Sequence, residues 1–137
     1  IDVRNDVEGQ RMGKHLVGMY LALQGLACAF FQLRHALHAR KFPLSELTLL
    51  ASERSAGKSM STPYGEKQVE AFSVERAQSC DFVLMAVSGS FSTEFSPQIT
   101  ANGKTVVIDN SSAFRYHDDI PLVVPEINQS AMDGKLL

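Results

Sequence analysis

Seven residues of this 137-residue sequence have the types and spacing that suit the binding of phosphorylated ligands. An arginine can donate two parallel charged hydrogen bonds to phosphate oxygens, and serine hydroxyls can donate more. Glycine and serine in a turn let backbone amides approach a pyrophosphate or ribose closely. The candidates are Ser52, Arg54, Ser55, Ser88, Gly89, Ser90 and Arg115.

Spacing alone leaves simpler interpretations open for each of these candidates. Residues 52–55 also suit a surface turn with incidental charges, and many βα turns contain Gly and Ser for conformational reasons only. For Arg115, spacing alone favours a surface arginine paired with Asp118 or Asp119. The four histidines have no metal-ligand spacing and no identifiable partner acid or nucleophile, so neither a metal site nor a catalytic residue is predicted.

The elements that must position these residues are apolar runs alternating with helical segments. Short continuous apolar runs are typical of strands buried on both faces. The predicted strands are residues 19–23, 47–51, 68–72, 82–87, 105–109 and 122–124. A predicted helix ends at Arg40, two others occupy residues 73–78 and 92–102, and residues 55–65 are a predicted loop. Pro97 is expected to weaken or kink the third helix.

This alternation predicts a Rossmann-like, doubly wound α/β fold with a mainly parallel sheet flanked by helices. In such a sheet, ligands bind beyond the carboxyl ends of the strands, which is where the seven candidates stand. The length fits one domain, and a formal net charge of −2 supplies no basic field that would attract nucleic acid.

The end of the second strand is where dinucleotide folds contact the adenosine ribose. An acid there accepts a hydrogen bond from the 2′-hydroxyl of NAD, whereas an arginine with hydroxyls suits the 2′-phosphate of NADP. Ser52, Arg54 and Ser55 therefore favour NADP, and Glu53 complicates this preference. Alternation along an extended segment would point Glu53 away from Ser52 and Arg54.

An apolar run in the N-terminal part allows more than one interpretation. The apolar run of residues 16–31 follows basic residues and imitates a secretory signal or short anchor, although interrupting glycines favour a buried strand, a turn and a helix. Cys28 and Cys80 lie in apolar surroundings without CxxC spacing, which predicts buried, reduced thiols. An isoleucine at position 1 suggests a fragment of a longer product.

Residues 41–47 (Lys-Phe-Pro-Leu-Ser-Glu-Leu), 51–58 (Ala-Ser-Glu-Arg-Ser-Ala-Gly-Lys) and 109–128 together resemble aspartate-semialdehyde dehydrogenase. The resemblance implies a dimeric, NADP-dependent cytoplasmic enzyme, or a plastid one in a eukaryote. Such enzymes reductively dephosphorylate L-4-aspartyl phosphate to L-aspartate 4-semialdehyde, on the route to lysine, methionine and threonine. No membrane or nucleic-acid partner is implied.

Carried over to this sequence, the resemblance places Ser52, Arg54 and Ser55 at the 2′-phosphate of NADP. It places Ser88, Gly89 and Ser90 near the ribose and pyrophosphate, and Arg115 at the substrate phosphate. Residues 1–137 are then a single NAD(P)-binding domain without the catalytic and dimerisation domain, in which residues 1–40 form a divergent N-terminal segment.

The sequence departs from the family pattern in two places. The glycine-rich turn expected after the first strand is replaced by residues 25–31 (Gly-Leu-Ala-Cys-Ala-Phe-Phe), which puts coenzyme affinity in doubt. The family's nucleophilic cysteine, in an Asn-Cys context beyond the Val-Pro-Glu segment, is missing, so no catalytic residue is assigned and the chain alone is expected to be inactive. The alternatives are an N-acetyl-glutamyl-phosphate reductase-like fragment and a non-catalytic nucleotide-binding or interaction module.

Overall fold

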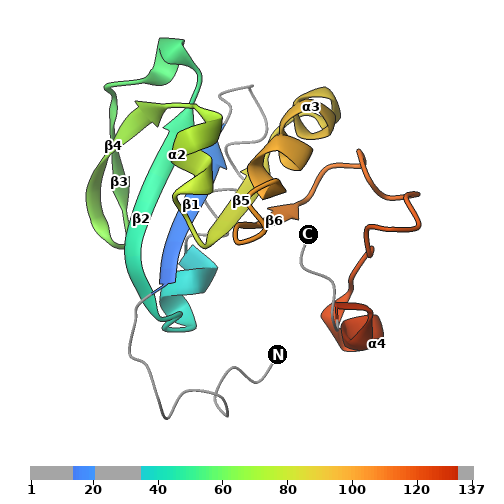
Figure 1. Ribbon diagram of the computed structural model, residues 1–137. Coiled ribbons are helices and arrows are strands. Elements are labelled where there is room, and N and C mark those ends of the chain that lie inside the picture. Colours follow the sequence, from blue (N-terminus) through green and yellow to red (C-terminus); the bar gives the residue numbers. More distant parts are fainter. Residues whose placement is uncertain (1–13, 21–34, 133–137) are drawn as a thin grey trace.

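The computed structural model describes residues 14–20 and 35–132, which form one six-stranded sheet with helices on its faces (Figure 1). The strands are β1 (Lys14–Tyr20), β2 (Leu44–Ala51), β3 (Ser59–Thr62), β4 (Gly65–Ala71), β5 (Phe82–Ala86) and β6 (Val106–Asp109). The helices are α2 (Val74–Gln78), α3 (Gly89–Thr100) and α4 (Pro125–Asn128), together with a helical turn at residues 35–39. Two 3-10 turns, Glu53–Ser55 and Gln129–Met132, complete the described elements.

The strand order in the sheet is β3-β4-β2-β1-β5-β6. All neighbours from β4 to β6 pair in parallel, and β3 alone runs antiparallel, beside β4. The chain first builds outward from β1 through β2 to β4, and it then crosses back to place β5 on the other side of β1. This reversal creates a switch point between β1 and β5. The predicted doubly wound α/β fold is confirmed.

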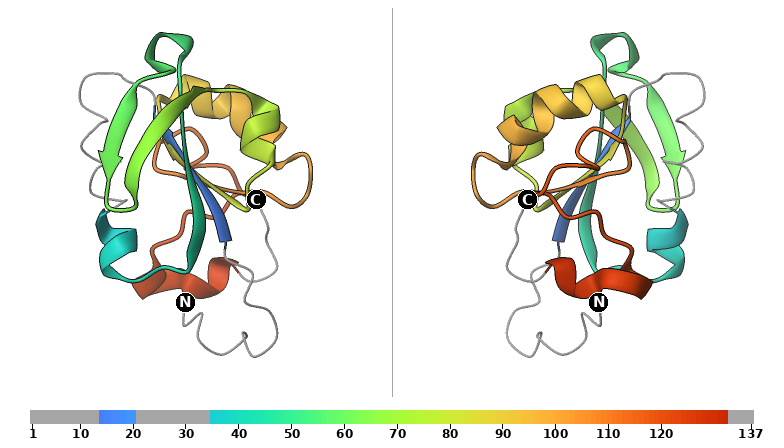
Figure 2. Two further views of the ribbon diagram at one scale, coloured as in Figure 1. Left: turned by 90° about the vertical axis from the view of Figure 1, so that its left-hand side faces the viewer. Right: turned by 90° about the vertical axis from the view of Figure 1, so that its right-hand side faces the viewer.

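Two apolar clusters occupy the two faces of the sheet, because successive strand side chains point to opposite sides. Leu50, Val83 and Met85 pack with Ala77 and Ile99 beneath α2 and α3. The opposite face carries a second cluster, which is packed against Leu37 of the 35–39 turn and Met60 of β3; its buried members are Leu47, Leu49, Ala51, Val69, Leu84 and Ala86. The two side views in Figure 2 show α2 and α3 together on one face and the 35–39 turn on the other.

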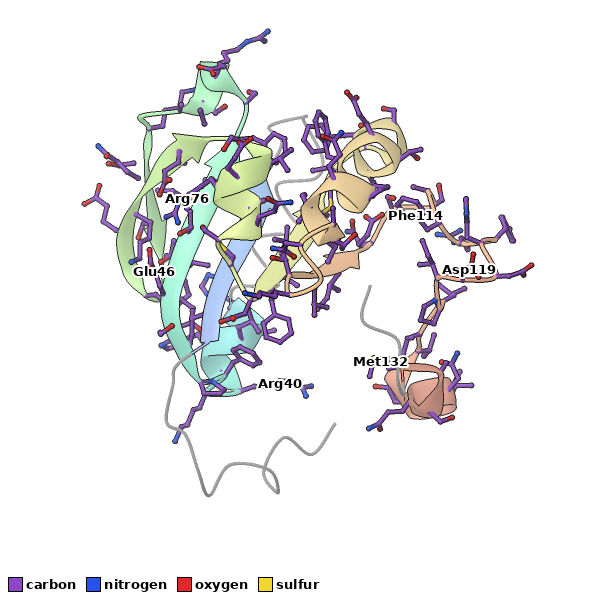
Figure 3. All side chains as sticks on the ribbon, viewed as in Figure 1. Arg40, Glu46, Arg76, Phe114, Asp119 and Met132 are labelled. Atoms are coloured by element: carbon purple, nitrogen blue, oxygen red, sulfur yellow. The ribbon has the colours of Figure 1, made fainter. Side chains whose placement is uncertain are left out.

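The five-residue helix α2 is too short to be stable by itself, so tertiary contacts must hold it. Its Ser73 N-cap accepts a hydrogen bond from the Arg76 amide. The Arg76 guanidinium donates to both Glu70 carboxylate oxygens, at 2.8 and 3.1 Å, and to Thr48 Oγ1 at 3.0 Å. Figure 3 shows Arg76 lying over β2 with Glu46, whose carboxylate is 3.7 Å away. These contacts fix α2, which follows the prediction for residues 73–78, across β2 and β4.

The predicted loop at residues 55–65 is wrong, because it contains strand β3. Residues Ser-Met-Ser-Thr of β3 carry no apolar run that would mark a strand. Pairing is fixed instead by the turn that follows, where Thr62 Oγ1 donates to Gly65 O at 2.7 Å and accepts from Tyr64 N at 3.1 Å. Gly65 has a φ of +92°, which favours glycine. Strand β4 begins three residues earlier than predicted, at Gly65, because its first residues pair with β3. Strand β2 also begins three residues early, at Leu44, where it pairs with β1 instead.

The predicted helix at residues 92–102 begins three residues earlier, at Gly89, and it continues through Pro97. Packing of Ser92, Ser96 and Ile99 against the sheet offsets the hydrogen bond that proline cannot donate. The helix ends at Thr100, two residues before the predicted end, and Gly103 beyond it has a φ of +66°.

The predicted strand at residues 122–124 is wrong. The Asn128 side chain accepts from Val124 N at 2.7 Å and donates to Leu122 O at 2.8 Å, so it takes the backbone groups that a neighbouring strand would pair. Pro125 then starts α4, where its missing N–H costs nothing.

The predicted first strand, residues 19–23, falls partly in β1 and partly outside the described residues. Cys28, the replaced glycine-rich turn and most of the apolar run also lie outside them. Within residues 14–20 and 35–132, no helix combines the length and apolar character needed to cross a membrane.

Candidate functional site

The carboxyl ends of β2, β1, β5 and β6 lie side by side along one edge of the sheet (Figure 1). Three of these strands are followed by predicted ligand-binding residues. Along the edge, residues 52–55 come first, then residues 88–90, and then the loop of residues 110–115. A dinucleotide in such a fold lies across the switch point, which here is flanked by the first two segments.

A hollow of about 490 Å³ opens where β2 ends, and it is lined by Ala51, Ser52, Glu53, Arg54, Phe72 and Phe91. Ser52 precedes the 3-10 turn Glu53–Ser55, whose Ser55 amide donates to Ser52 O at 2.8 Å. This turn is helical rather than extended, so the alternation expected to separate Glu53 from Ser52 and Arg54 does not apply. All three residues line the same hollow, whose lining therefore includes both a cationic and an acidic residue.

Ser55 is placed differently from its predicted partners. It is only 7% exposed and does not line the hollow, whereas Arg54 is exposed to solvent. The direct contact of Ser55 with a coenzyme phosphate stays a prediction.

Two phenylalanines in the wall of this hollow were not predicted from the sequence. Phe72 follows β4, and its amide donates to Ala51 O at 2.8 Å, while Phe91 lies in the first turn of α3. Their ring centroids are 5.1 Å apart, and Phe95 packs against both, at 5.1 and 4.4 Å. Phe91 and Phe95 stand four residues apart on a helix, a spacing that could have indicated an aromatic pair. The hollow thus joins an apolar wall to a polar rim that contains Arg54 and Glu53.

Ser88, Gly89 and Ser90 form the start of α3. The Ser88 hydroxyl accepts from the Phe91 amide at 3.4 Å, as an N-cap does, and lies 3.1 Å from the Ser90 hydroxyl. A Cβ built on Gly89 would lie 4.0 Å from the Ala113 amide nitrogen, so the loop after β6 packs beside this turn. The positive end of the helix dipole favours an anion at this place.

Arg115 lies in a second hollow, of about 690 Å³, which the chain forms between residues 115–122 and residues 128–131. Arg54 and Arg115 therefore line different hollows rather than one. Within the described residues no ion pair joins Arg115 to Asp118 or Asp119, so the alternative of a paired surface arginine is wrong. Arg115 is exposed and its amide donates to Ser112 O at 3.4 Å.

Cys80 is buried under α2 and reduced, as predicted. Burial raises the pKa of the Cys80 thiol, and the neighbouring Ser79 hydroxyl and Arg76 oppose that effect only in part. A raised pKa and a buried position are the opposite of what a nucleophilic cysteine needs. The described residues also contain no group of three His, Cys, Asp or Glu side chains that could hold a metal ion.

Residues 31–135 match the family described as semialdehyde dehydrogenase, NAD binding domain. The chain belongs to the semialdehyde dehydrogenase family. The sequence is 45% identical over 100 residues to aspartate-semialdehyde dehydrogenase of Synechocystis, covering 73% of this chain and 29% of that protein. It is 37% identical over 114 residues to the aspartate-semialdehyde dehydrogenase of Bacillus subtilis, covering 82% of this chain and 33% of that protein.

Solved structures agree with this family assignment. A Vibrio cholerae aspartate-semialdehyde dehydrogenase II complexed with ASA superposes with a TM-score of 0.72 and 36% identity, over 87% of this chain and 38% of that one. A Pseudomonas aeruginosa protein described as a probable aspartate-semialdehyde dehydrogenase superposes with a TM-score of 0.71 and 26% identity. The chain thus spans about a third of the relatives that it matches, and it corresponds to their NAD-binding part.

Proposed function

We propose that this chain is the NADP-binding part of an aspartate-semialdehyde dehydrogenase. The whole enzyme would convert L-4-aspartyl phosphate to L-aspartate 4-semialdehyde and act as a homodimer on these small molecules. The observation that carries the proposal is the hollow at the end of β2, where Arg54 and Ser52 stand beside Phe72 and Phe91. The names of the relatives support the choice of substrate.

The two halves of this hollow suit the two ends of an adenosine 2′-phosphate. Arg54 and Ser52 would hold the 2′-phosphate by charged hydrogen bonds, and the adenine would lie on the faces of Phe72 and Phe91. The pyrophosphate would then extend toward Ser88, Gly89 and Ser90 at the start of α3. Such a path follows the strand order from β2 across the switch point to β5.

Arg115 would hold the phosphoryl group of the substrate, since an exposed arginine without an acidic partner in the described residues is available for an anion. NADP supplies hydride transfer at its nicotinamide ring, and this chain contributes its binding and orientation. Cys80 cannot form an acyl intermediate because it is buried. The isolated chain is therefore expected to bind NADP without dehydrogenase turnover.

Fluorescence titration of the purified chain with NADPH and NADH tests the proposal. We expect Arg54→Ala to weaken NADPH binding by about tenfold to a hundredfold, as expected for loss of charged hydrogen bonds, and to leave NADH binding unchanged. Arg40→Ala is the matched control, since this arginine lies at the opposite end of the sheet (Figure 3). Equal binding of NADPH and NADH by the wild-type chain, or no binding of either, would refute the proposal.

A further inference from the structure

Asp109, the last residue of β6, accepts three hydrogen bonds from two separate elements. Its Oδ1 accepts from Ser111 N at 2.8 Å, and its Oδ2 accepts from Ser111 Oγ at 2.7 Å. The Oδ2 atom also accepts a short hydrogen bond from Ser92 Oγ in the second turn of α3. One carboxylate therefore ties the loop after β6 to α3.

The hydroxyls of Ser111 and Ser92 both donate to Asp109. Ser111 Oγ donates to Asp109 and accepts from Ala113 N at 3.1 Å, so it extends the tether two residues further into the loop. Ser92 is fully buried and gives its proton to Asp109, while its oxygen lies 3.1 Å from Ser96 Oγ. An ionised carboxylate carries only acceptor atoms, so Asp109 can accept from both serine hydroxyls at the same time.

Among the described residues, few other hydrogen bonds fix the position of the tethered loop. Its residues 110–116 form turns without a helix or strand, and β6 lies at the end of the strand order, with Ile108 53% exposed. The Asn110 amide reaches Met85 O only at 3.4 Å. The loop nevertheless packs on the start of α3, where Ala113 N comes within 4.0 Å of a Cβ built on Gly89.

The position of the tethered loop along the sheet edge indicates what the tether does. The hollow beside Arg54 comes first, the turn of Ser88, Gly89 and Ser90 comes second, and the tethered loop comes third. A dinucleotide that starts at the hollow must pass the α3 turn on its way to the loop. The loop is then the wall beside the half of the coenzyme that lies beyond the adenosine.

We infer that Asp109 is a positioning residue, which acts through Ser92 and Ser111 to hold the 110–113 loop against Gly89 and so shapes the site for the pyrophosphate and nicotinamide half of the coenzyme. This inference rests on the proposed function. It assigns no contact between Asp109 and the coenzyme itself.

The test uses the 137-residue chain with two probes, NADPH and adenosine 2′,5′-bisphosphate, of which the second lacks the nicotinamide half. Ser92→Ala removes the bond between α3 and Asp109, and alanine is well tolerated in a helix. Ser96→Ala is the matched control, since Ser96 is also buried, lies one turn further along α3 and makes no bond to the loop. Asp109→Asn is the second variant, because its amide replaces one of the two acceptor oxygens by a donor, so that it cannot accept from the Ser111 amide on one side and from both hydroxyls on the other.

We expect Ser92→Ala and Asp109→Asn to weaken NADPH binding by about tenfold and to change binding of the bisphosphate by less than about twofold. The nuclear Overhauser contact between Gly89 and the Ala113 amide should persist in Ser96→Ala and weaken in the other two variants. A merely structural role would reduce the affinity for both probes in parallel, and that outcome overturns the inference, as does unchanged NADPH binding. Failure of the wild-type chain to bind either probe would overturn the proposed function as well.

Discussion

Tyr64 carries a buried hydroxyl that costs stability. The residue lies in the turn between β3 and β4, and its ring packs on the cluster under β2 and β5, edge-on to His38 at 5.4 Å. Its hydroxyl oxygen is buried and has no hydrogen-bond partner among the described residues. Tyr64→Phe removes that oxygen and keeps the ring contacts.

The expected gain follows from the balance of two effects. A buried hydroxyl without a partner costs about 1–3 kcal/mol of desolvation, and the small void left by the removed oxygen takes back part of that gain. We therefore expect Tyr64→Phe to raise the free energy of unfolding by about 1 kcal/mol. For a domain of this size, that change corresponds to a rise in Tm of roughly 3–6 °C.

Urea unfolding followed by circular dichroism measures this change. The midpoint should rise while the slope m stays the same, since the surface exposed on unfolding is nearly unchanged. Tyr116→Phe is the matched control, because Tyr116 is 91% exposed and its hydroxyl is solvated in both states. Equal or lower stability of Tyr64→Phe would mean that the hydroxyl is satisfied in solution, and the argument would fall.

The pH dependence supplies an independent signature. Burial raises the pKa of the Tyr64 phenol in the folded chain, whereas the unfolded phenol ionises near its usual value of about 10. Above about pH 10 the unfolded state therefore binds fewer protons than the folded state, and the stability of the wild-type chain falls as pH rises. Tyr64→Phe lacks this loss, so its advantage should widen at alkaline pH. A constant difference between pH 8 and pH 11 would contradict the burial argument.

Two further predictions concern the docking of α2. Arg76→Lys should lower the free energy of unfolding by about 1 kcal/mol in urea titration, because lysine cannot reproduce the two-point contact with Glu70 together with the bond to Thr48. The effect is modest because the ion pair is partly exposed. Glu75→Gln on the exposed face of the same helix is the control, and an unchanged midpoint for Arg76→Lys would contradict this account. Cys80 should resist alkylation by iodoacetamide at pH 8 in the folded chain and react on unfolding in urea, as measured by peptide mass mapping, since burial raises its pKa; rapid modification of the folded chain would show that the thiol is accessible.

The parallel sheet could be predicted because its strands are buried on both faces and carry apolar runs without interruption. In β5, Val83 and Met85 face α2 and α3 while Leu84 and Ala86 face the other side, so every position is apolar. Strand β3 could not be predicted in this way, since its residues pair at an outer position where polar side chains are tolerated. Its signal is the turn chemistry of Thr62 and Gly65 rather than hydrophobicity.

The sequence indicates those residues of the candidate site whose type suits a phosphate, but it does not indicate those that only packing brings to the site. Arg54 and Ser52 could be chosen by type, since few other side chains suit a phosphate. Phe72 and Phe91 look like ordinary core residues in the sequence, and only the packing of their two rings on each other brings both to the same hollow.

Glu53 shows why the choice between NADP and NAD depends on backbone geometry. An extended segment would separate the Glu53 carboxylate from Ser52 and Arg54, whereas in the observed 3-10 turn all three residues line one hollow. A carboxylate there would accept a bond from a ribose 2′-hydroxyl and repel a 2′-phosphate, so it acts against Arg54. If the hollow holds the ribose, the preference for NADPH equals the attraction of its 2′-phosphate by Arg54 minus the repulsion by Glu53. The size of the preference then depends on how closely each side chain approaches the 2′-position.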